Sequence, residues 1–215
     1  MKAVVFVDVQ NDFVKGGALA YSYPEKPNTL AIIDFARDCR QKGYMLYATA
    51  DTHEQTVWDT YEPLAENRKP ISGYRTTFEG QRLPVDHCID GTTGHKLVDG
   101  LVKDCGIVNI PQGHIVDKPT FGSFDLLARI DQDFVVDDAG GLTKMSKFDG
   151  IGEPLDEIII CGYCTSICVV SNALMLRAKY PNVKIIVKAD LCGDIDEASH
   201  LAALKVMRNC QIDVE

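Results

Sequence analysis

The stretch LDEIIICGYCTSICVVSNALMLRAKYPNVKIIVKAD (residues 155–190) contains a strand, a helix and a second strand in succession. The apolar runs at 155–162 and 183–190 have the length of buried strands, and residues 166–180 carry apolar side chains at helical spacing. Two parallel strands need a long crossover between them, usually a helix. The stretch therefore predicts a parallel sheet with helices packed on its faces.

The same alternation continues on both sides of this stretch and predicts a doubly wound α/β fold. A chain of 215 residues fits one such domain, so we expect a single domain over residues 1–215. Strands are predicted at 2–10, 44–51, 106–110, 114–118 and 211–215, and helices at 29–43, 96–103, 123–131 and 196–209. Two segments, 51–95 and 138–154, lack periodicity and are predicted to be loops.

Composition limits the classes of function. The net charge is −9 and no dense run of Lys and Arg occurs, which argues against a nucleic-acid partner. The apolar run at 3–9 is too short for a membrane span and contains Asp8. We expect a cytoplasmic protein with a small-molecule partner and no membrane contact, and whether it forms a homo-oligomer is left open.

Polar and reactive side chains stand where predicted strands end. Asp8 closes the first strand and Asp51 follows the second. Lys118 closes the segment 114–118, and Cys168 follows the strand at 155–162 by one turn. In open α/β sheets ligands bind beyond the carboxyl ends of the strands, so these residues are expected to meet there.

Cys168 is expected in the first turn of a helix that Thr165 or Ser166 caps. This position predicts a lowered pKa and a reactive thiolate. A carboxylate could accept the thiol proton, and a lysine could balance the charges, which favours Asp8 and Lys118 as its partners. A buried structural cysteine is the alternative.

Asp51 and His53 alternate after the second strand, and His87 lies in the segment LPVDHCIDGT (83–92). One oxygen and two imidazole ligands suit a divalent transition metal with open coordination positions. Solvated loop residues are the alternative interpretation.

The pair Cys161 and Cys164 has the C-x-x-C spacing of a redox or zinc module. A redox pair normally opens a helix directly, and a zinc site would need further ligands such as His87 and Cys88. Both remain alternatives. Four other cysteines are expected to be buried, unreactive side chains: Cys39, Cys105, Cys192 and Cys210.

Taken together, five segments resemble the isochorismatase-like cysteine hydrolases and, within them, the nicotinamidase branch. They are VVFVDVQNDFVKGGAL (4–19), ADTHEQT (50–56), LPVDHCIDGTTGHKL (83–97), VDKPTFGSF (116–124) and ICGYCTSICVVSNAL (160–174). The resemblance covers nearly the whole chain. It implies a three-layer α/β/α sandwich around a six-stranded, mainly parallel sheet.

The resemblance also implies roles for individual residues. The triad would be Asp8, Lys118 and Cys168, and the backbone N–H groups of Cys164 and Cys168 would bind an oxyanion. The peptide bond between Tyr163 and Cys164 would be cis. The metal would be zinc, with iron or manganese as alternatives, and its ligands would be Asp51, His53 and His87.

The function implied is hydrolysis of nicotinamide to nicotinate and ammonia through a thioester, within NAD recycling. Another small amide, a carbamoyl compound or a hydrazide is the alternative substrate. The aromatic side chains that could contact the substrate are Phe13, Trp58, Tyr61 and Phe121. Two residues depart from the family pattern: Thr52, where nicotinamidases often carry Trp, and Ser166, where members often carry an acid.

Overall fold

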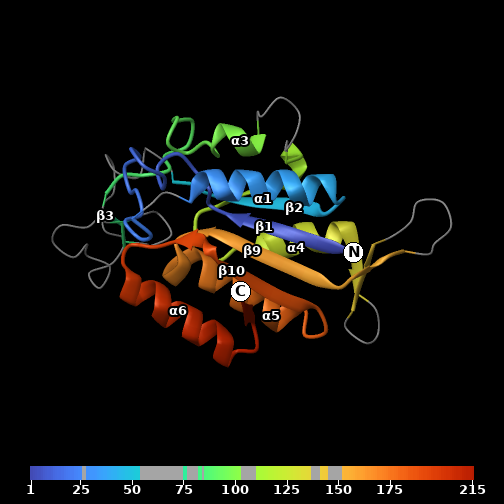
Figure 1. The fold of residues 1–215 in the computed structure, drawn as a ribbon. Coiled ribbons are helices and arrows are strands. Elements are labelled where there is room, and N and C mark those ends of the chain that lie inside the picture. The colour runs from blue at the N-terminus through green and yellow to red at the C-terminus, as the bar shows by residue number, and fades with distance from the viewer. Residues whose placement is uncertain are drawn as a thin grey trace, which may run out of the picture.

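Six parallel strands form the central sheet in the order β11–β10–β9–β1–β2–β5 (Figure 1). The computed structural model describes residues 1–25, 28–53, 75–76, 82–83, 85–102, 110–136, 141–144 and 152–215. The strands are β1 (Lys2–Val7), β2 (Met45–Asp51), β5 (Ile115–Lys118), β9 (Glu157–Tyr163), β10 (Lys184–Gly193) and β11 (Asp213–Val214).

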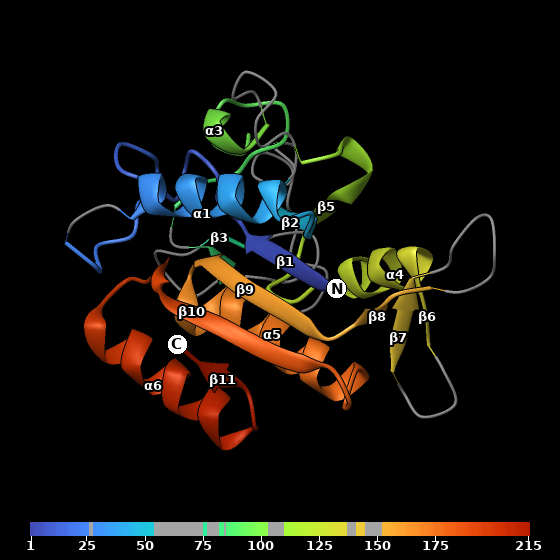
Figure 2. The same cartoon turned by 45° about the vertical axis from the view of Figure 1, so that its right-hand side comes forward.

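Helices cover both faces of the sheet (Figure 2). The helices α1 (Thr29–Gln41) and α3 (Asp99–Val102) lie on one side, and α4 (Phe124–Asp133), α5 (Val170–Lys179) and α6 (Glu197–Asn209) lie on the other. Right-handed crossovers explain this division, because the chain adds strands in one direction from β1 and in the other from β9. The predicted six-stranded α/β/α sandwich is confirmed.

The central strands are apolar because they are covered on both faces. Every residue from Ala3 to Val7 in β1 is fully buried, as are Ile158, Ile160 and Cys161 in β9. Strands buried on both faces are continuous apolar runs, whereas half-exposed strands alternate. This is why the stretch that begins at residue 155 could be recognised as a parallel strand.

Two small sheets were not predicted. The segment expected to be a loop at 138–154 contributes to an antiparallel sheet of β6 (Phe134–Val136), β7 (Leu142–Lys144) and β8 (Pro154–Leu155). A hairpin of β3 (Arg75–Thr76) and β4 (Arg82–Leu83) lies in the other expected loop. Strands of two or three residues are too short for periodicity to reveal them.

The helix predicted at 96–103 begins later than expected, and the strand predicted at 106–110 falls mostly outside the described residues. Backbone bonds tie residues 96–98 to the chain after β1: Asn11 N donates to Lys96 O, and Val98 N donates to Val9 O. These bonds hold the backbone outside a helix, so α3 begins at Asp99. Ile110 is described and is not part of a strand.

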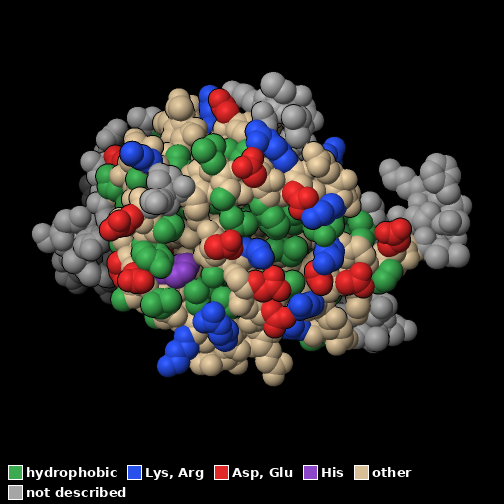
Figure 3. Space-filling model, in the orientation of Figure 1, with side chains coloured by type: hydrophobic (Ala, Val, Ile, Leu, Met, Phe, Trp, Pro, Cys, Tyr) green, Lys and Arg blue, Asp and Glu red, His purple; other side chains and the backbone are tan. Residues whose placement is uncertain are grey.

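Over the described part of the face in Figure 3, basic and acidic side chains are interspersed. Among the described residues no helix is long and apolar enough to cross a bilayer, and α1 and α6 have 13 residues each.

The strand order reverses between β1 and β9, which are hydrogen-bonded neighbours. Asp8 follows β1, and Cys164 follows β9 at the same edge of the sheet. A reversal of this kind leaves a crevice at the carboxyl ends of the strands, which is where doubly wound folds bind ligands.

Candidate active site

Lys118 lies at the centre of a buried polar cluster at this crevice. Its Nζ is 2.7 Å from Asp8 Oδ2, 3.4 Å from Cys168 Sγ and 3.4 Å from Asp51 Oδ1. Nζ also donates to Thr120 O at 3.0 Å, and the side chain is only 1% exposed. The ends of β1, β2 and β5 therefore meet the turn after β9, as the sequence predicted for these four side chains.

Asp8 is held by the neighbouring strand β2. Its backbone has a φ of 50°, an uncommon value that Asp tolerates better than most residues. Asp8 N donates to Thr49 O at 3.1 Å, and Thr49 Oγ1 donates to Asp8 Oδ1 at 2.6 Å. These bonds occupy Oδ1 and leave Oδ2 facing Lys118.

Burial dominates the electrostatics of the acid and the thiol. It raises the pKa of Asp8 above its ordinary value, although Lys118 opposes the shift. Burial also raises the pKa of the Cys168 thiol well above its ordinary value, again against the charge of Lys118. The expected lowering of the Cys168 pKa at a helix N-terminus was wrong, because the turn is buried. The resting thiol is protonated and needs a base to become a nucleophile.

Burial would lower the pKa of the Lys118 ammonium, but the charge of Asp8, with further contributions from Cys168 and Asp51, outweighs it and raises the pKa well above the ordinary value. Lys118 is therefore a fixed positive charge between the other three groups.

Cys168 lies in a π-helical turn, η3 (Thr165–Val169), that leads directly into α5. Val169 N donates to Cys164 O at 3.0 Å, and Asn172 Nδ2 donates to Cys168 O at 2.8 Å. Turns of this kind are frequent at functional sites. The Tyr163–Cys164 peptide bond is cis, as the resemblance implied.

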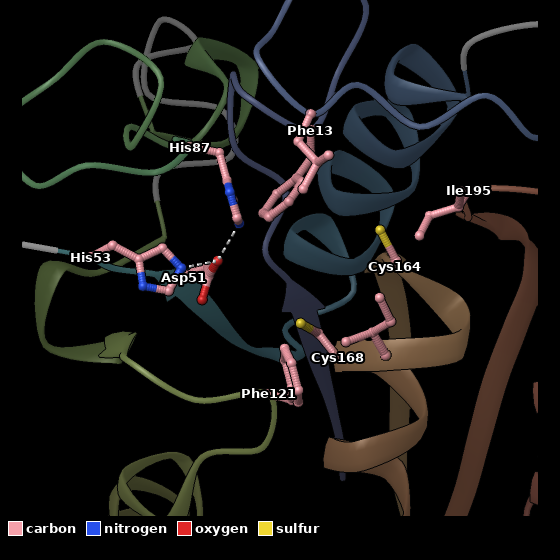
Figure 4. Close-up of a pocket in the computed structure, with 10 residues that line it drawn as sticks. Phe13, Asp51, His53, His87, Phe121, Cys164, Cys168 and Ile195 are labelled. Carbon is pink, nitrogen blue, oxygen red and sulfur yellow. Dashed lines mark hydrogen bonds and ion pairs between the residues drawn. The ribbon is translucent and has the colours of Figure 1, made fainter. Parts of the chain in front are cut away.

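Asp51, His53 and His87 converge beside Lys118 (Figure 4). One ligand atom from each of the three buried residues lies within 4.8 Å of the others. His53 Nε2 is 3.0 Å and His87 Nε2 is 3.3 Å from Asp51 Oδ2. Burial would raise the pKa of Asp51, but the hydrogen bonds to both imidazoles and the charge of Lys118 hold it well below its usual range.

This donor set fits a divalent metal ion. His87 Nδ1 lies 2.8 Å from Val85 O, a group that only accepts, so Nδ1 carries a hydrogen and Nε2 is the ring nitrogen that can bind a metal ion. A backbone carbonyl that orients an imidazole in this way is typical of metal sites. His53 Nδ1 is buried and finds no hydrogen-bond partner among the described residues, so the ring has no competing contact on that side.

A cavity of about 120 Å³ joins the metal-ligand set to the thiol (Figure 4). It is lined by Phe13, Leu19, Asp51, His53, His87, Phe121, Cys164, Ile167, Cys168 and Ile195. Pockets for drug-sized ligands measure about 300–1,000 Å³, so this one suits a smaller molecule. Of the four aromatic candidates, Phe13 and Phe121 line the cavity, whereas Trp58 and Tyr61 lie outside the described residues.

Comparison with known proteins identifies the family. The model of the isochorismatase domain matches residues 2–215. The chain belongs to the isochorismatase family.

Relatives of this isochorismatase-family chain are known from sequence and structure. A nicotinamidase of Schizosaccharomyces pombe is 29% identical over 99% of this chain and 91% of its own length. A probable inactive nicotinamidase of Arabidopsis thaliana is 25% identical over 96% of this chain and 88% of its own length. The solved pyrazinamidase of Pyrococcus horikoshii in complex with zinc is 20% identical, with a TM-score of 0.64, and the match covers 100% of this chain and 98% of that one. The last likeness shows a shared fold.

The cysteines of the C-x-x-C pair have different surroundings in this isochorismatase-family chain. Cys164 lines the cavity, and burial raises its pKa to about 12. Cys161 is fully buried within β9 and does not line that cavity. Cys39 and Cys192 are buried as expected, but Cys210 is exposed because it follows the last turn of α6. Cys105 lies outside the described residues.

Two supporting residues of the site, Gln10 and Thr49, were missed by sequence analysis. Gln10 is buried between β2 and the loop after His87: its Nε2 donates to Asp51 O at 2.8 Å and to His95 O at 2.7 Å, and its Oε1 accepts from Asp51 N. Thr49 supports Asp8, as described above. Thr49 is a polar residue inside an apolar strand, and that was the available signal.

Ser166, the departure from the family pattern, is bonded to a carboxylate from another element. Its N–H donates to Asp194 Oδ2 at 2.8 Å, and its hydroxyl donates to Asp194 Oδ1 at 2.9 Å. The other departure, Thr52, has its Oγ1 2.8 Å from His95 Nε2, and it also donates to Ala50 O. Neither departure moves Asp51 or His53 out of the cluster.

Proposed function

We propose that this protein hydrolyses nicotinamide to nicotinate and ammonia through a thioester on Cys168. The observation that carries the proposal is the contact of one lysine with a thiol, a carboxylate and a metal-ligand set. Lys118 Nζ lies within 3.4 Å of side-chain atoms of Cys168, Asp8 and Asp51. The nicotinamidase relatives support the choice of substrate.

Asp8 would act as the base for the first step. It takes the proton from Cys168, and Sγ then attacks the carboxamide carbon, so that an S–C bond forms and the carbonyl π electrons move to oxygen. The raised pKa of Asp8 makes its carboxylate a stronger base than an ordinary aspartate, which favours acceptance of the thiol proton. Backbone N–H groups of Cys164 and Cys168 would stabilise the oxyanion.

Collapse of this intermediate breaks the C–N bond. Asp8 returns its proton to the leaving nitrogen, which departs as ammonia and leaves a thioester on Cys168. Asp8 then accepts a proton from water, whose oxygen attacks the thioester carbon, and the S–C bond breaks. Asp8 returns this proton to Sγ to restore the thiol, and the carboxylic acid loses its own proton to ammonia or solvent to give nicotinate. Lys118 would keep a positive charge beside Asp8 and the thiolate throughout.

Asp51, His53 and His87 would hold a divalent metal ion, which we propose is zinc with iron or manganese as alternatives, since two imidazoles and one carboxylate occur in both zinc and Fe(II) sites. When bound there, the ion would supply a Lewis-acid centre for the pyridine nitrogen and so orient the substrate. The zinc in the related pyrazinamidase supports this assignment. Phe13 packs edge-on against His87 with ring centroids 5.5 Å apart, and it would limit the space beside the pyridine ring of the substrate.

The test is hydrolysis of nicotinamide by the metal-loaded protein, with nicotinate and ammonia measured together. We expect equal amounts of the two products. Benzamide is the matched control because it has the same shape without the ring nitrogen, and it should be hydrolysed far more slowly. No hydrolysis of nicotinamide by folded, metal-loaded protein would refute the proposal, and hydrolysis of a carbamoyl compound or hydrazide instead would assign the alternative substrate class.

A further inference from the structure

Asp194 is a fully buried carboxylate that the proposed chemistry does not use. It directly follows β10, and its side chain accepts three hydrogen bonds. Two come from the N–H and hydroxyl of Ser166, at 2.8 and 2.9 Å, and one comes from Ile195 N at 2.8 Å. A buried carboxylate is costly unless it is bonded in this way, so its bonding partners are held firmly.

The Ser166 bonds act on the turn that carries Cys168. Ser166 is the second residue of η3, and Cys164, which precedes η3, makes no side-chain capping bond. Asp194 therefore supplies from a neighbouring strand the cap that the local sequence lacks. Its negative charge also stabilises the N-terminal end of the η3 and α5 helix.

A second bond chain ties the same turn to β10 and α6. Thr165 Oγ1 donates to Gly193 O at 3.1 Å and lies 2.9 Å from His200 Nδ1. Because the Thr165 hydroxyl hydrogen points to Gly193, His200 Nδ1 must carry a hydrogen and donate to Thr165. The beginning of η3 is thus fixed to the end of β10 twice: Thr165 bonds to Gly193, and Ser166 bonds to Asp194.

The backbone of Asp194 is fixed from the other side. Asp194 N donates to Tyr23 O at 2.8 Å, and Tyr23 N donates to Asp194 O at 3.0 Å. The next residue, Ile195, lines the cavity. Asp194 consequently connects the N-terminal segment, one cavity wall and the turn of Cys168.

We propose that Asp194 is a positioning residue, which through Ser166 holds the first turn of η3 so that the Cys168 thiol and the backbone N–H groups of Cys164 and Cys168 keep their places at the cavity. The anchoring of η3 by Asp194 can be tested whatever reaction the protein catalyses, whereas the expected effect on kcat rests on the proposed function. Small displacements of reacting groups are costly: about 1 Å can reduce a rate about 100-fold.

The experiment compares Asp194→Ala with Asp196→Ala. Asp196 makes the same pair of bonds at the start of α6, accepting from Ser199 N at 2.8 Å and from Ser199 Oγ at 2.9 Å, but it is exposed and does not line the cavity. Each variant loses a serine-bonded cap, and only the first cap belongs to η3. Hydrogen exchange followed by mass spectrometry measures how firmly the turn is held, and kcat and KM for nicotinamide measure the effect on catalysis.

For Asp194→Ala we expect amides of residues 164–169 to exchange at least about tenfold faster. We expect kcat to fall about 100-fold with KM changed less than about threefold, because the oxyanion contacts strengthen in the transition state. For Asp196→Ala, exchange should increase only at the start of α6, and kcat should stay within about twofold.

Two milder variants keep the test decisive if Asp194→Ala does not fold. Asp194→Asn can still accept from Ser166 N and donate to its hydroxyl, but it loses the bond from Ile195 N, so kcat should fall slightly and stay within about tenfold of the wild-type value. Ser166→Ala loses one of the two bonds, and we expect a kcat loss of about three- to tenfold.

Unchanged exchange at 164–169 in Asp194→Ala would overturn the anchoring, as would wild-type behaviour of Ser166→Ala in both measurements if Asp194→Ala is unfolded. Faster exchange with an unchanged kcat would overturn the positioning role. If the wild-type protein hydrolyses no amide, the proposed function fails, and the exchange comparison alone still decides whether Asp194 anchors η3.

Discussion

Asp8 and Asp51 stand at the ends of neighbouring strands and contact the same ammonium group, yet their pKa values shift in opposite directions. Burial raises the pKa of Asp8, whereas two imidazoles, together with Lys118, hold the pKa of Asp51 well below its usual range. Carboxylates whose environments separate their pKa values in this way commonly have different tasks. Asp8 is thereby made the stronger base of the two, and Asp51 remains an anion suited to a cation.

The largest expected effect comes from Asp8→Asn, which removes the proposed base and keeps the shape of the side chain. We expect kcat to fall by about 1,000- to 10,000-fold, because general acid–base catalysis contributes up to about this much. The metal content per chain should remain that of the wild type. Activity within tenfold of the wild-type value in a folded variant would contradict the role of Asp8.

Asp51→Asn tests the other carboxylate, whose proposed task is metal binding and not proton transfer. The variant loses an anionic metal ligand, so we expect its metal content after dialysis to fall and kcat/KM to drop about 100-fold as substrate positioning is lost. Excess zinc should restore part of the activity. Added metal should not rescue Asp8→Asn, and equal rescue of both variants would argue against the division of tasks.

Thr49→Val should have the smallest effect and should act on Asp8 alone. The Thr49 hydroxyl bond to Asp8 lowers the pKa of that carboxyl, so its removal should raise the pKa further. A base must be ionised, and kcat/KM should therefore begin to fall at a higher pH as the solution is acidified. At neutral pH the loss should stay below about tenfold, since one hydrogen bond contributes roughly 0.5–1.5 kcal/mol.

Thr49→Ser keeps the hydroxyl and is the matched control. Its pH profile should follow that of the wild type. An acid limb in Thr49→Val that is unchanged, or that moves to lower pH, would show that Asp8 does not control this part of the profile.

The convergence of Asp8, Asp51 and Lys118 could be predicted because parallel strands bring their carboxyl ends to one edge. Each residue is the polar end of an apolar run, which is a local signal. The supporting residues could not be found in this way. Thr49 meets Asp8, and Asp194 meets Ser166, only through the alignment of separate strands, which a single sequence does not specify.

The reactivity of Cys168 was harder to predict than its location. A helix N-terminus lowers the pKa of a thiol when the turn is accessible, but here burial dominates and raises it. The degree of burial depends on how η3 packs against the strand ends and is not encoded by the spacing of the cysteines.

The most direct test of the account compares Cys168→Ala with Cys164→Ala in the release of ammonia from nicotinamide. Both thiols line the cavity, but only Cys168 contacts Lys118 in the described structure. We predict that Cys168→Ala abolishes release while folding and metal content are retained, and that Cys164→Ala still hydrolyses nicotinamide because its backbone N–H remains. Hydrolysis by Cys168→Ala, or loss of activity in Cys164→Ala alone, would contradict the account.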